Sequence, residues 1–516
     1  MIHAQIGFVS AQITSLPDDT VALKAMLAAR EAEIDRLHQI IKELQRHRFG
    51  RRAESLPVDQ LLLGLEEAEQ IEAEALTDAG TADSAKRVER AARRTNRGAL
   101  PSHLPRIERV IDLDDRTCPC CRSDLHVIGE DVSERLDIVP AQFRVVVTRR
   151  PKYACRACED VIVQAPAPAR LVEGGIPTEA SVAHVLVSKY ADHLPLYRQA
   201  QIYARQGVTL DRSTLADWVG KAAFLLRPVH ERLFERLKRS DRLFADETTA
   251  PVLDPGRGQT KTGQLFTYAR DDRPWGGLDP PGVAYLYAPD CKAEHPIRHL
   301  AGFNGTLQVD GYAGYKVLAA RNAVSLAFCW AHVRRRFYEL AQAGPAPIAT
   351  EVLARLAELY QVEGEIRGRP PDERRAVRQA RSRPVVEALE PWLKTKLTLI
   401  SQKSKLAEAI RYALSRWAGL SRFLDDGRIE IDNNVVERAI RPLALTRKNA
   451  LFAGSDGGAA HWAVVASLVE TCKLNGVDPQ AYLADVVARI VAGHPQSGLD
   501  DLLPWAYAPQ PLRAVA

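Results

Sequence analysis

The spacing of hydrophobic and polar residues changes character several times along the chain. Near the N-terminus, apolar residues recur at intervals of three, four or seven, at Leu23, Leu27, Ile34, Leu37, Ile41 and Leu44. This heptad-like spacing predicts a short coiled coil within residues 1–53, through which copies of the chain would form a homo-oligomer. Arg30 interrupts one seam position, and an amphipathic helix packed on its own chain would give the same pattern.

Helical spacing returns in the segment LPLYRQAQIYARQGVTLDRSTLADWVGKA. It predicts one helix over residues 197–205, a turn at Gly207 and a second helix over residues 213–221 that residues 211–213 could cap. Helix, short glycine turn and helix make up the helix-turn-helix outline, although any helical hairpin imitates it. In that motif the start of the second helix faces the DNA groove. The residues there are Arg212, Ser213 and Thr214.

From residue 241 onward the pattern becomes the alternation typical of β-strands. Three segments read as consecutive strands separated by Gly, Pro and Asp turns: DRLFADETTAPVLD, TGQLFTYARD and GVAYLYAPD. A short helix in HPIRHLA, a strand in TLQVDGYAGY, and a strand running into a helix in SLAFCWAHVRRRF follow. This order predicts a ribonuclease-H-like mixed sheet, which carries one acid on its first strand and another at the end of its fourth. Asp246 and Asp310 occupy those places.

The third acid of such a site should lie on a later helix, and DNNVVERAIRPLALTRKN provides Glu437. Asn433, Glu437 and Arg441 are four residues apart and therefore share one helix face. Asn433, Arg438 and Arg441 are placed to orient phosphates beside the carboxylate. A surface ion pair between Glu437 and Arg441 is the simpler alternative, so the placement of the acids on strand, strand and helix is what singles them out.

The chain between the second and third acids is longer than the compact sheet needs. Residues 345–425 show helical spacing in EVLARLAELY, RRAVRQARSRPVVEALEPWL and KLAEAIRYALSRW, which predicts a helical insertion. Its basic residues are Lys394, Lys396, Lys403, Lys405, Arg411 and Arg416. They could hold DNA, although a solvated charged face is the simpler interpretation.

Charge is distributed unevenly in a chain of ordinary overall composition. With 46% hydrophobic and 26% charged residues and a net charge of +5, the chain is globular, not collagen-like, mucin-like or fully disordered. Residues 54–83 carry nine acids and no Lys or Arg, whereas residues 86–109 carry eight basic residues and two acids. Such blocks are typical of solvated linkers, and the basic one could also neutralise phosphates. Neither a secretory signal nor a membrane span is predicted, so we expect a cytoplasmic protein without a membrane partner.

Five of the eight cysteines fall in the two short segments TCPCC and YACRACED. Two C-x2-C pairs supply four thiolates suited to one structural zinc ion: Cys118, Cys121, Cys155 and Cys158. Cys120 is a possible substitute ligand, and disulfides are the alternative, which a reducing cytosol disfavours. Alternating residues at 143–148 predict strands between the pairs.

The predicted zinc site is surrounded by basic residues, among them Arg149 and Arg150, as expected for a DNA-contacting ribbon. The other cysteines are scattered, and the simplest expectation is that all three are small buried apolar residues. They are Cys291, Cys329 and Cys472.

Taken together, these segments resemble the DDE transposases of the insertion-sequence 66 family over almost the whole chain. Besides the leucine-zipper-like start, the matching segments are LPSHLPR, CPCC…CRAC, SKYADHLPLYRQAQIYARQGV, ADETT, VDGYAGY, CWAHVRRRF, DNNVVERAIRPLALTRKNALFAGSDGGA and CKLNGVDPQAYLADVV. The resemblance implies that Asp246, Asp310 and Glu437 are the catalytic acids. Cys329 and His332 match a C-x2-H signature of many such enzymes, with either an accessory or a packing role.

The resemblance also implies the chemistry and the partners. Two Mg²⁺ ions per active site, with Mn²⁺ able to substitute, would be held by the three carboxylates. Water would free a 3′-OH at each transposon end, and that hydroxyl would attack target DNA directly. The partners would be double-stranded DNA and accessory proteins encoded by the same element, with the chain on the nucleoid when active. A nonenzymatic zinc and helix-turn-helix regulator, and a ribonuclease-H-fold nuclease without strand transfer, are the alternatives.

The predicted architecture is a multidomain α/β protein. Its parts are a coiled-coil helix (1–53), an acidic then basic linker (54–110), a zinc-finger DNA-binding domain (111–170), a helix-turn-helix-like domain (171–240), the first part of the ribonuclease-H-like core (241–344), the helical insertion (345–425), the core helix with the third acid (426–470) and a C-terminal helical element (471–516).

Overall fold

The structure is a computed structural model that describes residues 142–154, 162–254, 256–321 and 324–508. The chain divides into two compact units, Met1–Lys86 and Arg87–Ala516, and every described residue belongs to the second. The predicted coiled coil, the linker and the four zinc-ligand cysteines lie outside the described residues. Of the helices that are described, none has the length and apolar character needed to span a membrane.

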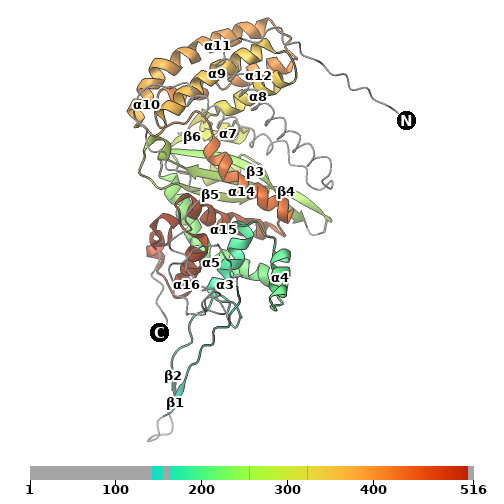
Figure 1. The fold of residues 1–516 in the computed structure, drawn as a ribbon, viewed down its shortest axis with the longest axis vertical. Helices are drawn as coiled ribbons and strands as arrows, with labels where there is room; N and C mark the ends of the chain where they lie inside the picture. Colours follow the sequence, from blue (N-terminus) through green and yellow to red (C-terminus); the bar gives the residue numbers. More distant parts are fainter. Residues whose placement is uncertain (1–141, 155–161, 255, 322–323, 509–516) are drawn as a thin grey trace, which may run out of the picture. The chain divides into compact units, whose positions relative to one another are not determined.

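The centre of the fold is a five-stranded mixed sheet in the order β5-β4-β3-β6-β7 (Figure 1). The strands are β3 (Arg242–Asp254), β4 (Gln259–Arg270), β5 (Gly282–Ala288), β6 (Gly305–Val309) and β7 (Val324–Phe328). β3 pairs antiparallel with β4 and parallel with β6, so the pairing changes from antiparallel to parallel at the central strand of the sheet. The helices between and after the strands are α6 (Glu294–His299), α7 (Ala313–Arg321) and α8 (Trp330–Gln342). The sequence predicts the five strands, α6 and α8 in this order. It does not predict α7, and the strand expected in TLQVDGYAGY ends at Val309.

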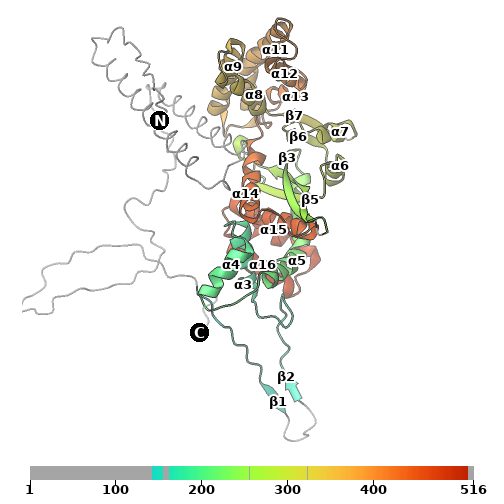
Figure 2. The ribbon, with the colours of Figure 1, turned by 90° about the vertical axis from the view of Figure 1, so that its right-hand side faces the viewer.

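Helices cover both faces of the sheet. Figure 2 shows α14 (Asn434–Ala450) on one side and α6 and α7 on the other. Accordingly, Arg242 at the start of β3 is followed by three consecutive apolar residues that are all fully buried, Leu243, Phe244 and Ala245. A strand buried on both faces reads as a continuous hydrophobic run, not as an alternation.

The outer edge of the sheet at β5 is covered by α15 (Asp456–Leu474). Ser467 Oγ accepts the Tyr285 N–H at 2.8 Å, and Thr471 Oγ1 accepts the Val283 N–H at 3.1 Å. The Thr471 hydroxyl also donates to the Val283 carbonyl at 3.0 Å. Hydroxyl side chains of a helix therefore satisfy the backbone groups that an edge strand leaves unpaired.

A helical layer precedes the sheet and packs against the C-terminal helices. It contains α3 (Glu179–Tyr190), α4 (Leu196–Arg205) and α5 (Arg212–Lys238), with α16 (Pro479–Val491) contacting α3. Gly207 has a φ of 80°, which confirms the predicted turn. The helix predicted over residues 213–221 is wrong in length, because α5 continues to Lys238. The apolar stripe of α5 continues past Lys221 through Leu226, Val229, Leu233 and Leu237, all fully buried.

The strand prediction at residues 143–148 is also wrong. The paired strands nearby are β1 (Lys152–Ala154) and β2 (Ile162–Gln164), which form an antiparallel pair. The side chains of Val145 and Val147 are 88% and 72% exposed, so the alternation there does not mark a buried face. Alternation predicts a strand only where one face is buried and a partner backbone is available.

Further helices lie between β7 and α14, in the stretch where an insertion was predicted. They are α9 (Pro347–Ile366), α10 (Pro371–Val377), a π-helix (Arg378–Ser382), α11 (Arg383–Thr398), α12 (Lys405–Leu414) and α13 (Trp417–Leu420). Apolar side chains of α9, α11, α12 and α13 form a second core with α8 and with Ala327 of β7. Short 3₁₀ helices occupy Arg273–Trp275, Arg422–Leu424, Gln496–Leu502 and Pro504–Ala506. The boundaries of the predicted domains stay predictions.

Candidate active site

The first predicted acid lies on β3, and the second directly follows β6, the parallel neighbour of β3. Phe244 of β3 is the register partner of Gln308 of β6, and Asp246 and Asp310 each follow two residues later. Side chains two residues apart on a strand share a face, so the register directs both carboxylates to the same level of the sheet. The Asp246 Oδ1 accepts the Glu247 N–H at 2.8 Å, and the Asp310 Oδ1 accepts the Tyr312 N–H at 3.1 Å.

The third predicted acid is brought to this place by α14. Asn433, the N-cap residue of α14, donates its amide Nδ2 to the Ala245 carbonyl at 3.3 Å, directly before Asp246. The Asn433 backbone N–H donates to the Cys329 Sγ at 3.2 Å. Glu437 lies in the first turn of the helix, on the side of Asn433. Farther along α14, Arg447 donates to the Thr249 carbonyl at 2.7 Å, so the helix is fixed to β3 at two levels.

The segment that precedes α14 is held by the side chain of Gln308 on β6. Gln308 is 1% exposed and donates its Nε2 to the carbonyls of Glu430 and Asp432, at 3.0 and 3.3 Å. Its Oε1 accepts the Glu430 N–H at 3.0 Å. One buried amide therefore pairs three backbone groups of the segment before α14, two residues from Asp310.

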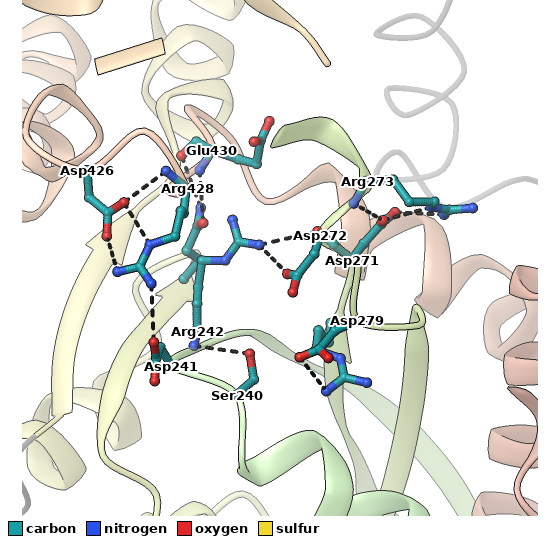
Figure 3. A network of polar contacts seen from close by, with 12 residues as sticks. Ser240, Asp241, Arg242, Asp271, Asp272, Arg273, Asp279, Asp426, Arg428 and Glu430 are labelled. Atoms are coloured by element: carbon teal, nitrogen blue, oxygen red, sulfur yellow. Dashed lines mark hydrogen bonds and ion pairs between the residues drawn. The ribbon is translucent and has the colours of Figure 1, made fainter. Parts of the chain in front are cut away.

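A polar network fixes the same segment to the beginning of β3 (Figure 3). Arg428 reaches Asp241 at 3.2 Å and Asp426 at 2.9 Å. Beside it, the buried Arg242 of β3 pairs with Asp272 at 2.6 Å. Together with the Gln308 hydrogen bonds, the contact of Arg428 with Asp241 holds the segment before α14 close to the beginning of β3.

The electrostatics of the site favour a cation. Burial raises the pKa of Asp246 well above its usual range, and the charges of Asp310, Glu247 and Glu437 raise it further. Within the described part of the chain, neither Asp246 nor Asp310 forms an ion pair with Lys or Arg. Neighbouring half-buried carboxylates without a positive partner are hard oxygen donors, which fit a divalent ion such as Mg²⁺ or Mn²⁺.

Glu247 is a fourth acid that the sequence analysis missed. Its register partner is Phe266, whose ring centroid lies 5.4 Å from that of His299 on α6. Glu247 therefore lies on the face of the sheet that α6 covers, and Asp246 lies on the opposite face. Burial raises the pKa of Glu247 to about 8, and the charge of Asp310 contributes. The signal was the consecutive Asp and Glu in ADETT, but strand alternation sends the two side chains to opposite faces.

Comparison with known proteins identifies the family. The family model described as "Transposase IS66 family" matches residues 174–461, more than half of the chain. The chain belongs to the IS66 transposase family. Models of the same family match residues 115–159 (zinc-finger binding domain of transposase IS66), 467–505 (IS66 C-terminal element) and 36–109 (Transposase C of IS166 homeodomain).

Two similar relatives come from Sinorhizobium fredii. Uncharacterized protein y4qI is 46% identical and covers 96% of this chain and 98% of its own. Uncharacterized protein y4jD is 47% identical, with 95% of this chain and 96% of its own covered. Together with the family models, these matches indicate a DNA-binding transposase that uses a divalent metal and zinc.

In this IS66 transposase, the described residues contain two clusters of side chains that could hold a metal ion. One is Cys329, His332 and Glu437, and the other is Asp290, Glu294 and His295. Within each cluster the possible ligand atoms lie within 4.8 Å of one another. The three predicted catalytic acids are not such a group among the described residues. Glu437 Oε1 lies 3.7 Å from His332 Nδ1. Cys329 and Cys472 are buried as expected, but Cys291 is exposed, so the prediction for that residue is wrong.

The residues predicted to contact DNA differ in their exposure to solvent. Arg212 and Ser213 are exposed at the beginning of α5, Thr214 is half-buried, and Arg149 and Arg438 are exposed. Arg150 donates its Nε to the Ala165 carbonyl at 2.9 Å, and Arg441 is half-buried. Asn433 is 1% exposed, which favours a positioning role over a phosphate contact.

Proposed function

We propose that this protein is a DDE transposase that cleaves DNA at the ends of an insertion sequence and joins the freed 3′ ends to target DNA. The observation that carries the proposal is the parallel register that aligns Asp246 with Asp310, together with the Asn433 contact that brings the Glu437 helix to the same strand. The strand order, with three antiparallel strands followed by two parallel ones, supports a ribonuclease-H-like core.

Each side chain has a role in this proposal. Asp246, Asp310 and Glu437 would hold two Mg²⁺ ions, with Mn²⁺ able to substitute. Bound there, divalent ions supply an activated attacking oxygen and stabilise the leaving oxygen. Arg438, exposed on the first turns of α14, binds a phosphate and orients it toward the carboxylates. Gln308 and Asn433 keep the acids aligned but do not touch the substrate.

The experiment is strand transfer in vitro with the ends of the element, comparing the wild type with Asp246→Asn and Asp310→Asn. We expect both variants to lose strand transfer and to keep end binding in a gel-shift assay, because each change removes one carboxylate and little volume. Asp254→Asn, at the far end of the same strand β3, is the matched control and should retain activity.

Two outcomes would overturn the proposal. DNA binding without cleavage or joining, the same in the wild type and in Asp246→Asn, would favour a nonenzymatic DNA-binding regulator. Cleavage by the wild type without joining to target DNA, seen by sequencing the products, would favour a nuclease.

A further inference from the structure

The helical stretch between β7 and α14 reaches the loop that carries Asp310. Tyr412, on α12, donates its hydroxyl to the Asp310 carbonyl at 2.8 Å. Arg416, one turn later, lies 3.5 Å from the Gly311 carbonyl through its Nη2. This part of the second core is therefore joined to the proposed active site by direct hydrogen bonds.

Two guanidinium groups stack on the ring of Tyr412. The Cζ of Arg416 lies 3.8 Å from the ring centroid, and the Cζ of Arg336, on α8, lies 4.0 Å from it. Stacking on an aromatic ring holds a guanidinium in place and leaves its N–H groups at the edge free to bind an anion. Two cations on one ring repel each other, so an anion that both can reach would stabilise the arrangement.

The acids within reach do not neutralise this pair. Among the described residues, Arg416 bonds only to neutral groups, the Tyr412 carbonyl at 3.3 Å, the Ser415 hydroxyl at 3.2 Å and the Gly311 carbonyl. Its Nε is buried and lacks a hydrogen-bond partner among the described residues. Arg336 lies 3.6 Å from Glu408, whose side chain is 68% exposed, and such a contact contributes little.

The loop after β6 is shaped to admit Arg416. Gly311 has a φ of +121°, and a Cβ at this position would lie 2.7 Å from the Arg416 Nε. Any larger residue would push the guanidinium away from the loop. The charges of Arg336 and Arg416 also act on His332, which faces Glu437, so the pair lies beside the acids and not on a remote surface.

We propose that Arg336 and Arg416, held on the Tyr412 ring, bind a DNA backbone phosphate next to the one that reacts. The helices between β7 and α14 thereby supply part of the substrate site. The inference rests on the proposed function. Because guanidinium groups recognise phosphate oxygens and not base edges from this position, the contact is independent of DNA sequence.

The test is the salt dependence of DNA binding by the full-length protein in an Asp246→Asn background, which removes turnover. The probes are a duplex with the element's end and a duplex of unrelated sequence. Each phosphate contact contributes about 0.9 to the slope of log K against log salt. We expect the double variant Arg336→Gln/Arg416→Gln to lower that slope by at least about 0.9 on both duplexes.

Two further variants separate a phosphate contact from a structural role. Arg416→Lys with Arg336 intact keeps the charge and should restore most of the slope. Arg355→Ala is the matched control, because Arg355 also stacks on a ring, that of Trp392 at 4.8 Å, but is already paired with Glu351 at 2.9 Å. It should leave the slope unchanged.

An unchanged slope in a double variant that melts at the wild-type temperature would overturn the inference, as would a loss confined to the element's end. Neither result would affect the proposed function if the wild type still joins DNA ends. Conversely, if the wild type joins no ends but the double variant lowers the slope as expected, the proposed function is overturned and the phosphate contact stands.

Discussion

At the scale of single residues, two buried amide side chains align the acids without adding charge to the site. Gln308 and Asn433 are both 1% exposed, and the side-chain amide of each donates to backbone carbonyls of another segment. A charged residue in either position would change the pKa of Asp246, which burial and three neighbouring acids already raise. Alignment by neutral groups leaves the negative charge of the acids available for metal ions.

Gln308→Leu should therefore destabilise the fold. The change leaves three backbone groups of residues 430 and 432 without a partner, and each such buried group costs about 1–3 kcal/mol. The measurement is the free energy of unfolding in urea. Gln402→Leu is the control, because Gln402 is exposed and a change there should stay within about 0.5 kcal/mol. An equal loss of unfolding free energy in both variants would contradict the stabilising role of Gln308.

Glu247 predicts a pH dependence of stability. Its pKa is raised from 4.5 to about 8, so the folded chain retains a proton that the unfolded chain releases between those values. The stabilisation is complete below pH ~4.5 and is lost as the pH rises through ~8. Glu247→Gln mimics the protonated form and should gain stability relative to the wild type as the pH rises. Melting temperatures in metal-free buffer at pH 5 to 9 measure this, and a constant difference would contradict it.

At the scale of elements, the order of strands and helices could be predicted from the sequence, but lengths and contacts could not. The alternation in β4 and β5 and the acids at β3 and β6 are local signals. The length of α5 depends on the C-terminal helices that cover it, and the missing strand at residues 143–148 depends on a partner backbone. The site followed the same rule: Asp246 and Asp310 were visible in the pattern, whereas Tyr412 reaches Asp310 only through tertiary contacts.

Buried ion pairs between side chains hold the π-helix Arg378–Ser382. Arg378 is fully buried and forms a bidentate pair with Glu363 at 2.7 and 2.6 Å. Arg374 contacts the same carboxylate at 3.3 Å and Glu430 at 2.8 Å. The Arg374–Glu430 ion pair thus connects the helices of the second core with the segment before α14 that Gln308 binds.

Glu363→Gln should cost about 3–5 kcal/mol of unfolding free energy, because it leaves two buried guanidinium groups short of a charge. Urea unfolding measures the loss. Glu351→Gln removes an acid from an exposed pair with Arg355 on the same helix α9, and should cost no more than about 1 kcal/mol. A similar small loss in Glu363→Gln would show that the buried network adds little.

At the scale of the whole molecule, the proposed active site joins elements that are far apart in sequence: β3, the loop after β6 and α14. An ion held by the three acids would bind the folded chain only, and so should stabilise all of it. At a concentration of 100 Kd the gain is about 2.7 kcal/mol. The expected result is a higher melting temperature with Mg²⁺ or Mn²⁺ than with chelator.

This stabilisation should disappear in Asp246→Asn. It should also weaken as the pH falls, because protons compete with the ion for a carboxyl group whose pKa is raised. An equal stabilisation of the wild type and Asp246→Asn would place the bound ion elsewhere in the chain.

The hydroxyls of α15 have a consequence for truncated forms of the protein. Ser467 and Thr471 occupy the hydrogen-bonding positions that a neighbouring strand would fill beside β5. A chain shortened to end before Ser467 would keep every strand of the sheet but present β5 as an open template for another molecule. We expect such a product to pair with a second copy through β5, so α15 protects the free edge of the sheet against association.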